Sequence, residues 1–349
     1  MKRFASSILL CSLLTLGACE SIFDGESPCG DEAMLVNLDV RVSLADVSDA
    51  KTRSDGSEAV GDNEKMSSLR IVIVRPDWTV EANRLVDLQA ATLRHEMERF
   101  KVFGDEEKLI YLFVNEDAVA PGSDLNLPRK LVDYDFGEIQ VGDRFPVNDI
   151  EGLRIRLDSD TERIEGPLPM SESHRHFVTR EAEQSCELFV TRAAVKFTFH
   201  FINDSGTAVT VDRLAINKMA REEWYMPRAK YAAAGEGTVN MEITDYEVPA
   251  GVGYYVFDYG LPSAWTVEAK GDKYLDPIYL LEGKYSEDRY SLDISLDKVS
   301  KNFYFNNLET LPRNTHVVVN VTFDMDSKIS CEVDVIPYGS VPLDPGFGL

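Results

Sequence analysis

The sequence contains few of the residues that build metal and redox sites. It holds five cysteines and five histidines in 349 residues, and no two cysteines are spaced as Cys-x-x-Cys. Common enzyme fingerprints are also absent, among them Gly-x-Ser-x-Gly, the Walker phosphate loop, the dinucleotide-binding pattern and His-Glu-x-x-His. These absences argue against hydrolase, nucleotide-dependent and zinc chemistry. We therefore expect a protein that is not an enzyme and that carries no metal and no cofactor.

Basic residues are scarce relative to acidic ones. The chain has 36 Lys and Arg against 60 Asp and Glu, a formal net charge of −24. Nucleic acids and anionic lipid surfaces both attract basic proteins, so neither is an expected electrostatic partner. Beyond the N-terminus, no apolar run is long enough for a membrane-spanning helix. What remains is an acidic protein whose expected partners are other proteins.

The N-terminus has the form of an export signal. Lys2 and Arg3 are followed by apolar or small residues from 4 to 16 and then by Leu16-Gly17-Ala18-Cys19. A basic start, a short apolar run and small residues before a cut site are typical of a signal peptide. The ending at Cys19 resembles the lipobox of bacterial lipoproteins. We expect a signal peptide over residues 1–18 and lipidation of Cys19.

Residues 19–33 are rich in acidic side chains and are expected to form a tether behind the lipid. Two interpretations stay open for this segment. It is either a solvated spacer or an address for the outer face of the cell, since acidic residues after the lipid cysteine resemble surface-export signals of some bacteria.

Residues 34–44, MLVNLDVRVSL, give the clearest strand pattern in the chain. Apolar and polar side chains alternate there, as they do in a half-buried β-strand. The apolar face consists of Met34, Val36, Leu38, Val40, Val42 and Leu44. The polar stretch that follows, residues 45–68, is expected to be a long exposed loop.

Many other short segments also favour strands, and few favour helices. The expected strands lie at residues 69–75, 108–115, 195–201, 209–216, 253–258, 277–281, 290–296, 317–323 and 329–335. Residues 81–102 fit a helix or a strand. Many short strands separated by turn residues predict an all-β protein made of sandwiches. Length and composition predict two domains, at residues 34–170 and 171–349, with the boundary in the Gly- and Pro-containing segment 166–170.

Three cysteines remain after the lipidated one. Cys186 and Cys331 are candidates for a disulfide, free thiols being the alternative, and Cys29 is left over. His174 and His176 could face one side of a strand, but a solvated loop is the favoured interpretation. The acidic group around Asp158 and Glu162 lacks the glycine and terminal glutamate of a calcium loop, so it too is expected to be a solvated loop.

Several segments, taken in order, resemble the fimbrillin superfamily of Bacteroidales-type bacteria. They include the start CESIFD with Pro28-Cys29, then TR at 52–53, SLRIVI at 68–73, LFVN at 112–115, LPMS at 168–171, TRAAVK at 191–196, RNTH at 313–316, and the ending PY at 337–338 with VPL at 341–343. The start is similar to that of fimbrial anchor lipoproteins. The set spans nearly the whole chain.

The resemblance implies two transthyretin-like β-sandwich domains with Greek-key topology and few short helices. It also implies a role in cell-surface fimbriae, assembled by β-strand exchange. In shaft subunits of such a family, an arginine-specific protease cuts after the first strand, and a neighbour's C-terminal strand fills the groove. Here the corresponding cut would fall between Arg53 and Ser54. The C-terminal strand has the apolar face Ile329, Cys331, Val333 and Val335.

These observations favour a fimbrial anchor or structural subunit, held by lipid in the outer membrane, exposed at the cell surface, with other fimbrial subunits as partners. A shaft or tip subunit cut after Arg53 is the first alternative. A surface glycan-binding lipoprotein that uses an exposed tryptophan, Trp224 or Trp265, is the second. A ligand for adhesion is not identified by the sequence.

Overall fold

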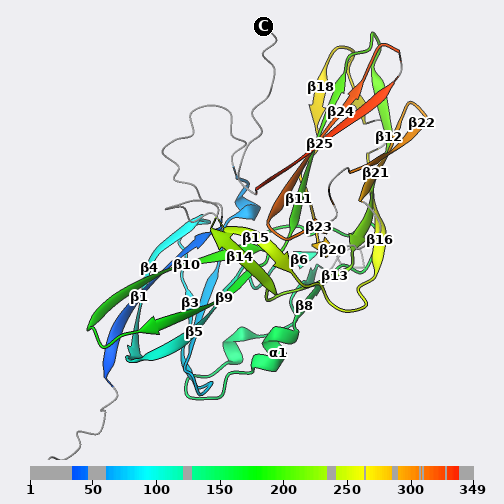
Figure 1. Cartoon of the computed structure of the whole chain (residues 1–349). Helices are drawn as coiled ribbons and strands as arrows, with labels where there is room; N and C mark the ends of the chain where they lie inside the picture. Colours follow the sequence, from blue (N-terminus) through cyan, green and yellow to red (C-terminus); the bar gives the residue numbers. More distant parts are fainter. Residues whose placement is uncertain are drawn as a thin grey trace, which may run out of the picture. The chain divides into compact units, whose positions relative to one another are not determined.

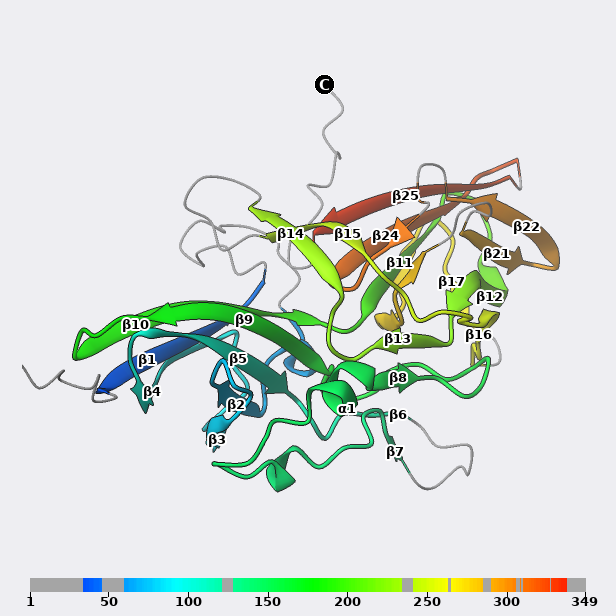
Figure 2. The same cartoon turned by 60° about the horizontal axis from the view of Figure 1, so that its bottom comes forward.

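The part of the chain that the computed structural model describes is built almost entirely from β-strands (Figures 1 and 2). It comprises residues 34–45, 60–120, 128–233, 241–262, 265–284, 290–305, 308, 310–326 and 328–337. Within these ranges the helical elements are the α-helix α1 (Val147–Gly152) and the short 3-10 helices η1 (Asp62–Glu64) and η2 (Phe136–Glu138). The prediction of an all-β fold with two β-sandwiches and few short helices is confirmed.

A seven-stranded sheet forms the first half of the fold, in the order β3-β2-β5-β9-β10-β1-β4. The bounds of these strands are β1 (Leu35–Leu44), β2 (Leu69–Val74), β3 (Val80–Val86), β4 (Arg94–Phe103), β5 (Glu106–Val114), β9 (Met170–Val178) and β10 (Glu183–Arg192). β1 pairs in parallel with β10 and antiparallel with β4, so it lies inside the sheet (Figure 1). Among the described strands, β1 is the sole ladder partner of β4.

Side chains connect the two edge strands of this sheet, β3 and β4. Glu81 of β3 accepts a hydrogen bond from the backbone N–H of Phe103 in β4. It also forms an ion pair with Lys108 of β5, whose side chain is fully buried. Arg84 of β3 donates to the carbonyl of Arg99 at 3.0 Å. The sheet therefore curls until its edges are joined by charged side chains, which protects exposed strand edges from pairing with other chains.

Two five-stranded sheets form the second half. The first has the order β18-β11-β24-β25, with β19 also paired to β11, and the second has the order β16-β12-β21-β22, with β17 paired to β12. Their bounds are β11 (Val195–Asn203), β12 (Val209–Ala220), β16 (Tyr254–Tyr259), β17 (Thr266–Val267), β18 (Asp272–Tyr274), β19 (Ile278–Leu280), β21 (Ser291–Leu296), β22 (Val299–Tyr304), β24 (Thr315–Phe323) and β25 (Ile329–Pro337).

Four short two-stranded ladders complete the described strands. They pair β6 (Val119–Ala120) with β7 (Arg129–Lys130), β8 (Arg154–Arg156) with β13 (Glu222–Trp224), β14 (Ala229–Ala233) with β15 (Met241–Tyr246), and β20 (Gly283–Lys284) with β23 (Thr310–Leu311). The β8–β13 ladder joins a segment of the first half of the chain to one of the second half.

An aromatic cluster also links the two halves of the chain. Tyr225, directly after β13, is fully buried, and its ring centroid lies 6.1 Å from that of Phe113 in β5 and 5.8 Å from that of Phe136 in η2. The rings of Phe113 and Phe136 are themselves stacked at 4.1 Å. Buried aromatic pairs of this kind stabilise a core beyond the area they bury. The core is thus continuous between the two sets of sheets.

The structure decides one open alternative and differs from the sequence-based expectations in two places. Residues 81–102, which fit a helix or a strand from the sequence, contain β3 and β4. The segment with His174 and His176 is part of β9 rather than a solvated loop. Within the expected exposed loop, the described residues Glu64 and Met66 are buried.

The seven-stranded sheet extends past the boundary expected at residues 170 and 171. β9 begins at that boundary and pairs with β5 along its whole length, from Met170 opposite Val114 to Val178 opposite Glu106. The polypeptide leaves this sheet only after Arg192, at the end of β10. Backbone pairing with β5 therefore holds β9 in the first sheet, and pairing with β9 and β1 holds β10 there, although both strands follow the Gly-Pro segment.

Candidate functional site

The strand β1 is the candidate site that the sequence predicts most clearly. Its apolar side chains Val36, Leu38, Val40, Val42 and Leu44 all point into the core, and each is at most 2% exposed. This confirms the alternation for five of the six positions. Met34 precedes the strand and is 43% exposed, so its assignment to the buried face is wrong. Residues at the end of a strand have fewer neighbours to cover them, so the buried apolar face begins at Val36 and leaves Met34 exposed.

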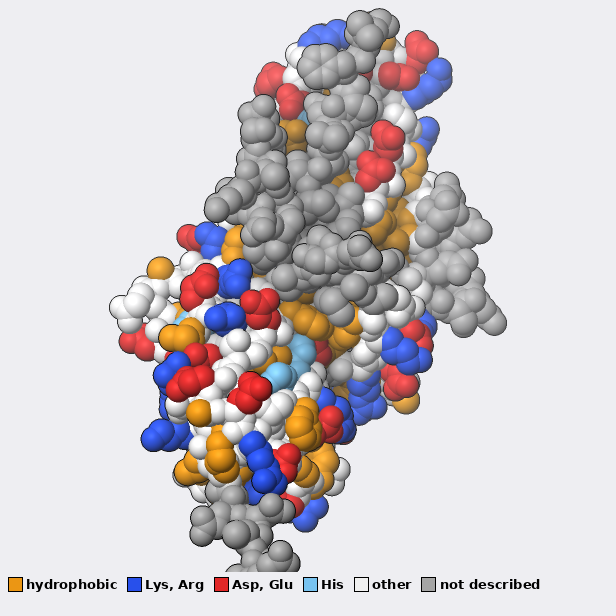
Figure 3. All heavy atoms as spheres, turned by 60° about the vertical axis from the view of Figure 1, so that its left-hand side comes forward, with side chains coloured by type: hydrophobic (Ala, Val, Ile, Leu, Met, Phe, Trp, Pro, Cys, Tyr) orange, Lys and Arg blue, Asp and Glu red, His pale blue; other side chains and the backbone are white. Residues whose placement is uncertain are grey.

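The outward face of β1 is held by polar contacts to both neighbouring strands. Asp39 accepts two hydrogen bonds from Arg99 of β4, at 2.7 and 2.9 Å. The Arg99 guanidinium holds the pKa of the Asp39 carboxyl below its ordinary value. Figure 3 shows acidic and basic side chains interspersed over the face of the molecule that comes forward in that view. Nothing in the sequence pairs Asp39 with Arg99, because the two residues are far apart along the chain.

The C-terminal strand β25 is an edge strand whose apolar face becomes steadily more exposed. Ile329 is 4% exposed, Cys331 and Val333 are half-buried, and Val335 is 46% exposed. The strand pairs with β24 through to Pro337. Its other edge has no partner among the described strands. The alternation predicted for β25 is present, but the apolar face is covered only at its beginning.

The two described cysteines are free thiols, so the candidate disulfide between them is absent. Cys186 lies in β10, opposite Val40 of β1, whereas Cys331 lies in β25, opposite Val321 of β24. A disulfide requires Cα atoms within about 7 Å, and these residues belong to different sheets. Burial raises the pKa of both thiols to about 12.

A buried charged centre surrounds Arg313, which sequence inspection did not identify as a site residue. Its side chain is 1% exposed and lies 3.1 Å from Glu282 Oε1 and 3.4 Å from Glu223 Oε1. It also donates to the backbone carbonyl of Tyr225 at 3.0 Å and to that of Trp224. Burial raises the pKa of Glu223. One cation thus holds two buried carboxylates beneath the turn after β13.

A third buried carboxylate, Glu172 of β9, lies close to this centre. It accepts a hydrogen bond from the hydroxyl of Tyr231 at 2.6 Å, and burial raises its pKa to about 7. The neighbouring Ser171 donates to the carbonyl of Tyr225 at 2.5 Å, the same oxygen that Arg313 contacts. These bonds connect β9 of the seven-stranded sheet to the second half of the chain.

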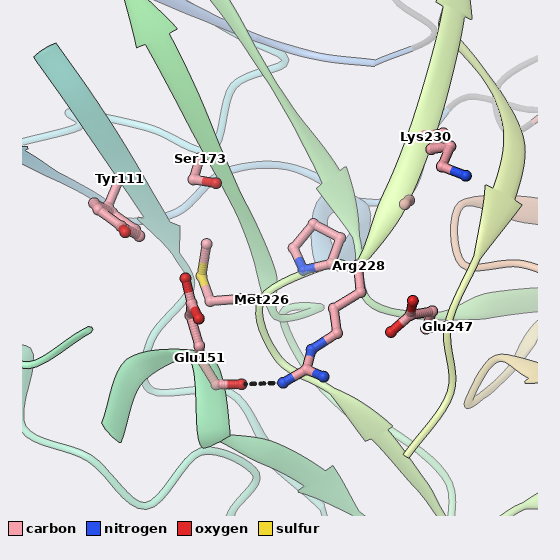
Figure 4. A pocket seen from close by; sticks show the side chains of 9 residues that line it. Tyr111, Glu151, Ser173, Met226, Arg228, Lys230 and Glu247 are labelled. Atoms are coloured by element: carbon pink, nitrogen blue, oxygen red, sulfur yellow. Dashed lines mark hydrogen bonds between the residues drawn. The ribbon is translucent and has the colours of Figure 1, made fainter. Parts of the chain in front are cut away.

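A pocket of about 410 Å³ opens beside this region (Figure 4). Tyr111 and Ser173 come from β5 and β9, whereas Met226, Arg228 and Lys230 come from the segment around β14. Figure 4 shows the Arg228 guanidinium extended to the backbone carbonyl of Glu151, which it reaches at 3.2 Å. The pocket is lined by acidic, basic and apolar side chains, and these lining residues are not arranged as a nucleophile beside a general base.

The other residues considered from the sequence are engaged in structural contacts. His174 Nε2 lies 2.7 Å from the carbonyl of Phe189, and burial lowers its pKa. Glu162 is 4% exposed and accepts from Arg129, so the acidic segment around it is not simply solvated. Trp224 is only 8% exposed, which removes it as an exposed sugar-binding tryptophan.

Two further findings concern metals and membranes. Among the described residues, no group of three His, Cys, Asp or Glu side chains is arranged to hold a metal ion. Nor does any helix in the described ranges have the length and apolar character to cross a membrane. Cys19, the tether 19–33, Arg53 and Ser54 all lie outside the described residues, so their predicted roles stay predictions.

Comparison with known proteins gives similarity at the level of structure. No family model and no curated protein matches the sequence. The tip fimbrial protein Mfa3 of Porphyromonas gingivalis, with a C-terminal truncation, is 10% identical over 87% of this chain and 100% of that chain, with a TM-score of 0.53. A candidate cell adhesion protein of Bacteroides eggerthii is 12% identical over 88% of this chain and 97% of that chain, with a TM-score of 0.50.

The identities are low, so the likeness concerns the fold. The chain has the fold of fimbrial and adhesion proteins of Bacteroidales, which confirms the resemblance expected from its scattered motifs.

Proposed function

We propose that this chain is a structural subunit of cell-surface fimbriae, and that it serves as the lipid-anchored subunit that retains its own first strand. The observation that carries the proposal is the position of β1, enclosed between β10 and β4 with five consecutive inward side chains buried. A strand so placed completes the sheet, and its removal would leave a groove with an unpaired edge on each side. The fold shared with fimbrial proteins supports the same role.

The membrane attachment in this proposal comes from the lipobox-like segment ending at Cys19. Two or more acyl chains on that cysteine would give stable anchoring in the outer membrane, whereas a single chain gives marginal, reversible binding. The subunit is not an enzyme in this account. Its work is mechanical, and its partners are other fimbrial subunits that contact it at the cell surface.

The C-terminal strand β25 is the proposed contact with the next subunit. Its outer edge is unpaired among the described strands, and Val335 near its end is 46% exposed. An extended segment with an open edge and partly uncovered apolar side chains suits β-strand addition or exchange, in which backbone hydrogen bonds supply affinity and alternate side chains supply specificity.

A matched pair of variants tests this contact. Val335 on β25 and Val299 on β22 are similarly exposed, at 46% and 43%, and both lie on edge strands of the second half. We expect Val335→Asp to reduce co-purification of the fimbrial partner by at least about tenfold, since a carboxylate would be desolvated in the contact. Val299→Asp is the control and should leave co-purification unchanged. Equal recovery with both variants would contradict the role of β25.

A shaft or tip subunit, cut after Arg53, is the second candidate. The similarity to a tip fimbrial protein favours it. The two candidates differ in one product: a cut subunit begins at Ser54 and has lost the segment that forms β1, whereas the anchor keeps both that segment and the lipid.

A further inference from the structure

The outward face of β1 carries two opposite charges, each facing a fixed opposite charge on a neighbouring strand. Asp39 is hydrogen-bonded to Arg99 of β4 at 2.7 and 2.9 Å. Two residues further along, Arg41 lies 3.5 Å from Glu187 of β10. The surroundings of β1 are therefore basic at the level of Asp39 and acidic at the level of Arg41.

Two further contacts shape these surroundings. Arg99 reaches across β1 to Glu183 of β10, 3.1 Å away, and Asn37 of β1 donates to the same carboxylate at 2.7 Å. Glu187 is shared, because Arg94 of β4 also lies 3.7 Å from it. The basic side is thus contributed by β4 and the acidic side by β10, and β1 separates them.

We infer that β4 and β10 form a charge-selective cradle, which prefers a strand with an acidic residue opposite Arg99 and a basic residue two positions later, opposite Glu187. This inference rests on the proposed function, because it states which strand the fimbrial subunit accepts. The preferred occupant is the chain's own β1. The apolar face of β1 alone cannot distinguish one strand from another, since many strands alternate in the same way. The charged side chains on the outward face supply the preference for one strand over others.

The same cradle disfavours the C-terminal strand of a second copy. In β25, Glu332 and Asp334 are two acidic residues separated by one apolar residue. When such a strand runs in the direction of β1 and places Glu332 opposite Arg99, Asp334 takes the position of Arg41 and faces Glu187. Like charges opposite each other destabilise a sheet. The chain would therefore keep its own strand rather than polymerise with itself, as the proposed anchoring role requires.

The solvent exposure of the charged side chains limits how strongly the cradle prefers one strand over another. The side chain of Asp39 is 14% exposed, but those of Arg99, Arg41 and Glu187 are 51%, 37% and 61% exposed. Water and salt screen pairs of this kind, so each contributes weakly. Reversing both pairs should change the affinity of a strand roughly threefold to tenfold at low salt, and less at high salt.

Peptide exchange into the full chain tests the inference. A specific protease site is placed within residues 46–59, the chain is cut there, and fluorescent peptides are added. One peptide has the sequence of residues 34–45, and the other carries Asp39→Arg with Arg41→Asp, so that composition and apolar face are the same. Fluorescence anisotropy should show at least about threefold tighter binding of the first peptide. In a chain with Arg99→Glu and Glu187→Arg the order should reverse.

The single variant Glu187→Arg, at an exposed position, provides a milder test if the double variant folds poorly. This variant should weaken the binding of the native 34–45 peptide and strengthen the binding of a peptide of residues 329–337. Equal binding of the native and the charge-swapped 34–45 peptides to every protein would overturn the charge selection while leaving strand exchange intact. If no peptide enters the cut chain, including the one with the native sequence, strand exchange itself is refuted and the inference falls with it.

Discussion

Arg313 gives the most quantitative prediction, because it is the cation between two buried carboxylates. The Arg313 side chain is 1% exposed, and those of Glu223 and Glu282 are 0% and 3% exposed. Arg313→Met keeps much of the volume but removes the charge. Breaking a buried ion pair by removing one partner costs about 3–5 kcal/mol, because the remaining charge stays buried without compensation. We therefore expect a loss of about 3–5 kcal/mol in the free energy of unfolding.

Urea denaturation followed by tryptophan fluorescence measures this loss. Arg175→Met is the matched control, since Arg175 and its partner Glu107 are 67% and 50% exposed and an exposed pair is worth only about 0–1 kcal/mol. Adding Glu223→Gln and Glu282→Gln to Arg313→Met should restore a large part of the lost stability, because the uncompensated charges are then gone. The loss should also be smaller at pH 5 than at pH 8, because at pH 8 a carboxyl buried without its cation must either stay charged or take up a proton when the chain folds.

Either of two results would contradict a loss of stability caused by buried charge. One is an Arg313→Met protein whose stability lies within about 1 kcal/mol of the native chain, as for an exposed pair. The other is a triple variant no more stable than Arg313→Met alone, which would show that lost hydrogen bonds to the Trp224 and Tyr225 carbonyls, and not buried charge, determine the cost.

Three further predictions concern single side chains. The pKa of Glu172 is raised to about 7, so the folded chain holds a proton there that the unfolded chain releases near pH 4.5, and the free energy of unfolding falls as the pH rises between these values. Between pH 5 and pH 7.5 the native chain should lose about 2 kcal/mol relative to Glu172→Gln. Parallel pH profiles of the two proteins would contradict this. Leu38→Ala, at a fully buried position of β1, should cost about 2–5 kcal/mol, whereas Leu35→Ala, at a 57% exposed position, should change stability by less than about 0.5 kcal/mol in the same urea titration. Asn115→Ala should lower the melting temperature by several degrees, since its buried side chain binds Ser67, Lys65 and Leu168 and its φ of 53° disfavours alanine; an unchanged melting temperature would argue against this role.

The strands that sequence inspection predicted are those with a regular pattern of burial. β1 alternates between buried and half-buried residues, and β2 and β24 are apolar runs with most residues buried, so side-chain polarity alone identifies them. β9 and β10 were missed because they carry many charged or polar residues on their outer faces, such as Glu183 and Glu187, which resemble loop composition. Residues 81–102 could be assigned to neither a helix nor a strand from the sequence, because apolar residues there, such as Met97, include exposed ones that do not mark the core face.

The charged part of the candidate site could not be predicted from local sequence. Asp39 and Arg99 are 60 residues apart, and Arg313 and Glu282 are 31 apart, so no short motif connects either pair. Composition assigns most of the acidic residues to the surface, and this is right for the majority. It fails for Glu172, Glu223 and Glu282, which are buried beside partners distant in sequence: Arg313 for Glu223 and Glu282, and Tyr231 for Glu172.

Mass spectrometry of the N-terminus of the native, surface-extracted protein tests the central claim most directly. If the chain is a fimbrial anchor that keeps its first strand, its N-terminal peptide will begin at an acylated Cys19, and peptides covering residues 34–44 will be recovered with the intact subunit. A mature protein that begins at Ser54 and lacks those residues would contradict the account, because the strand enclosed between β10 and β4 would then have to come from another molecule.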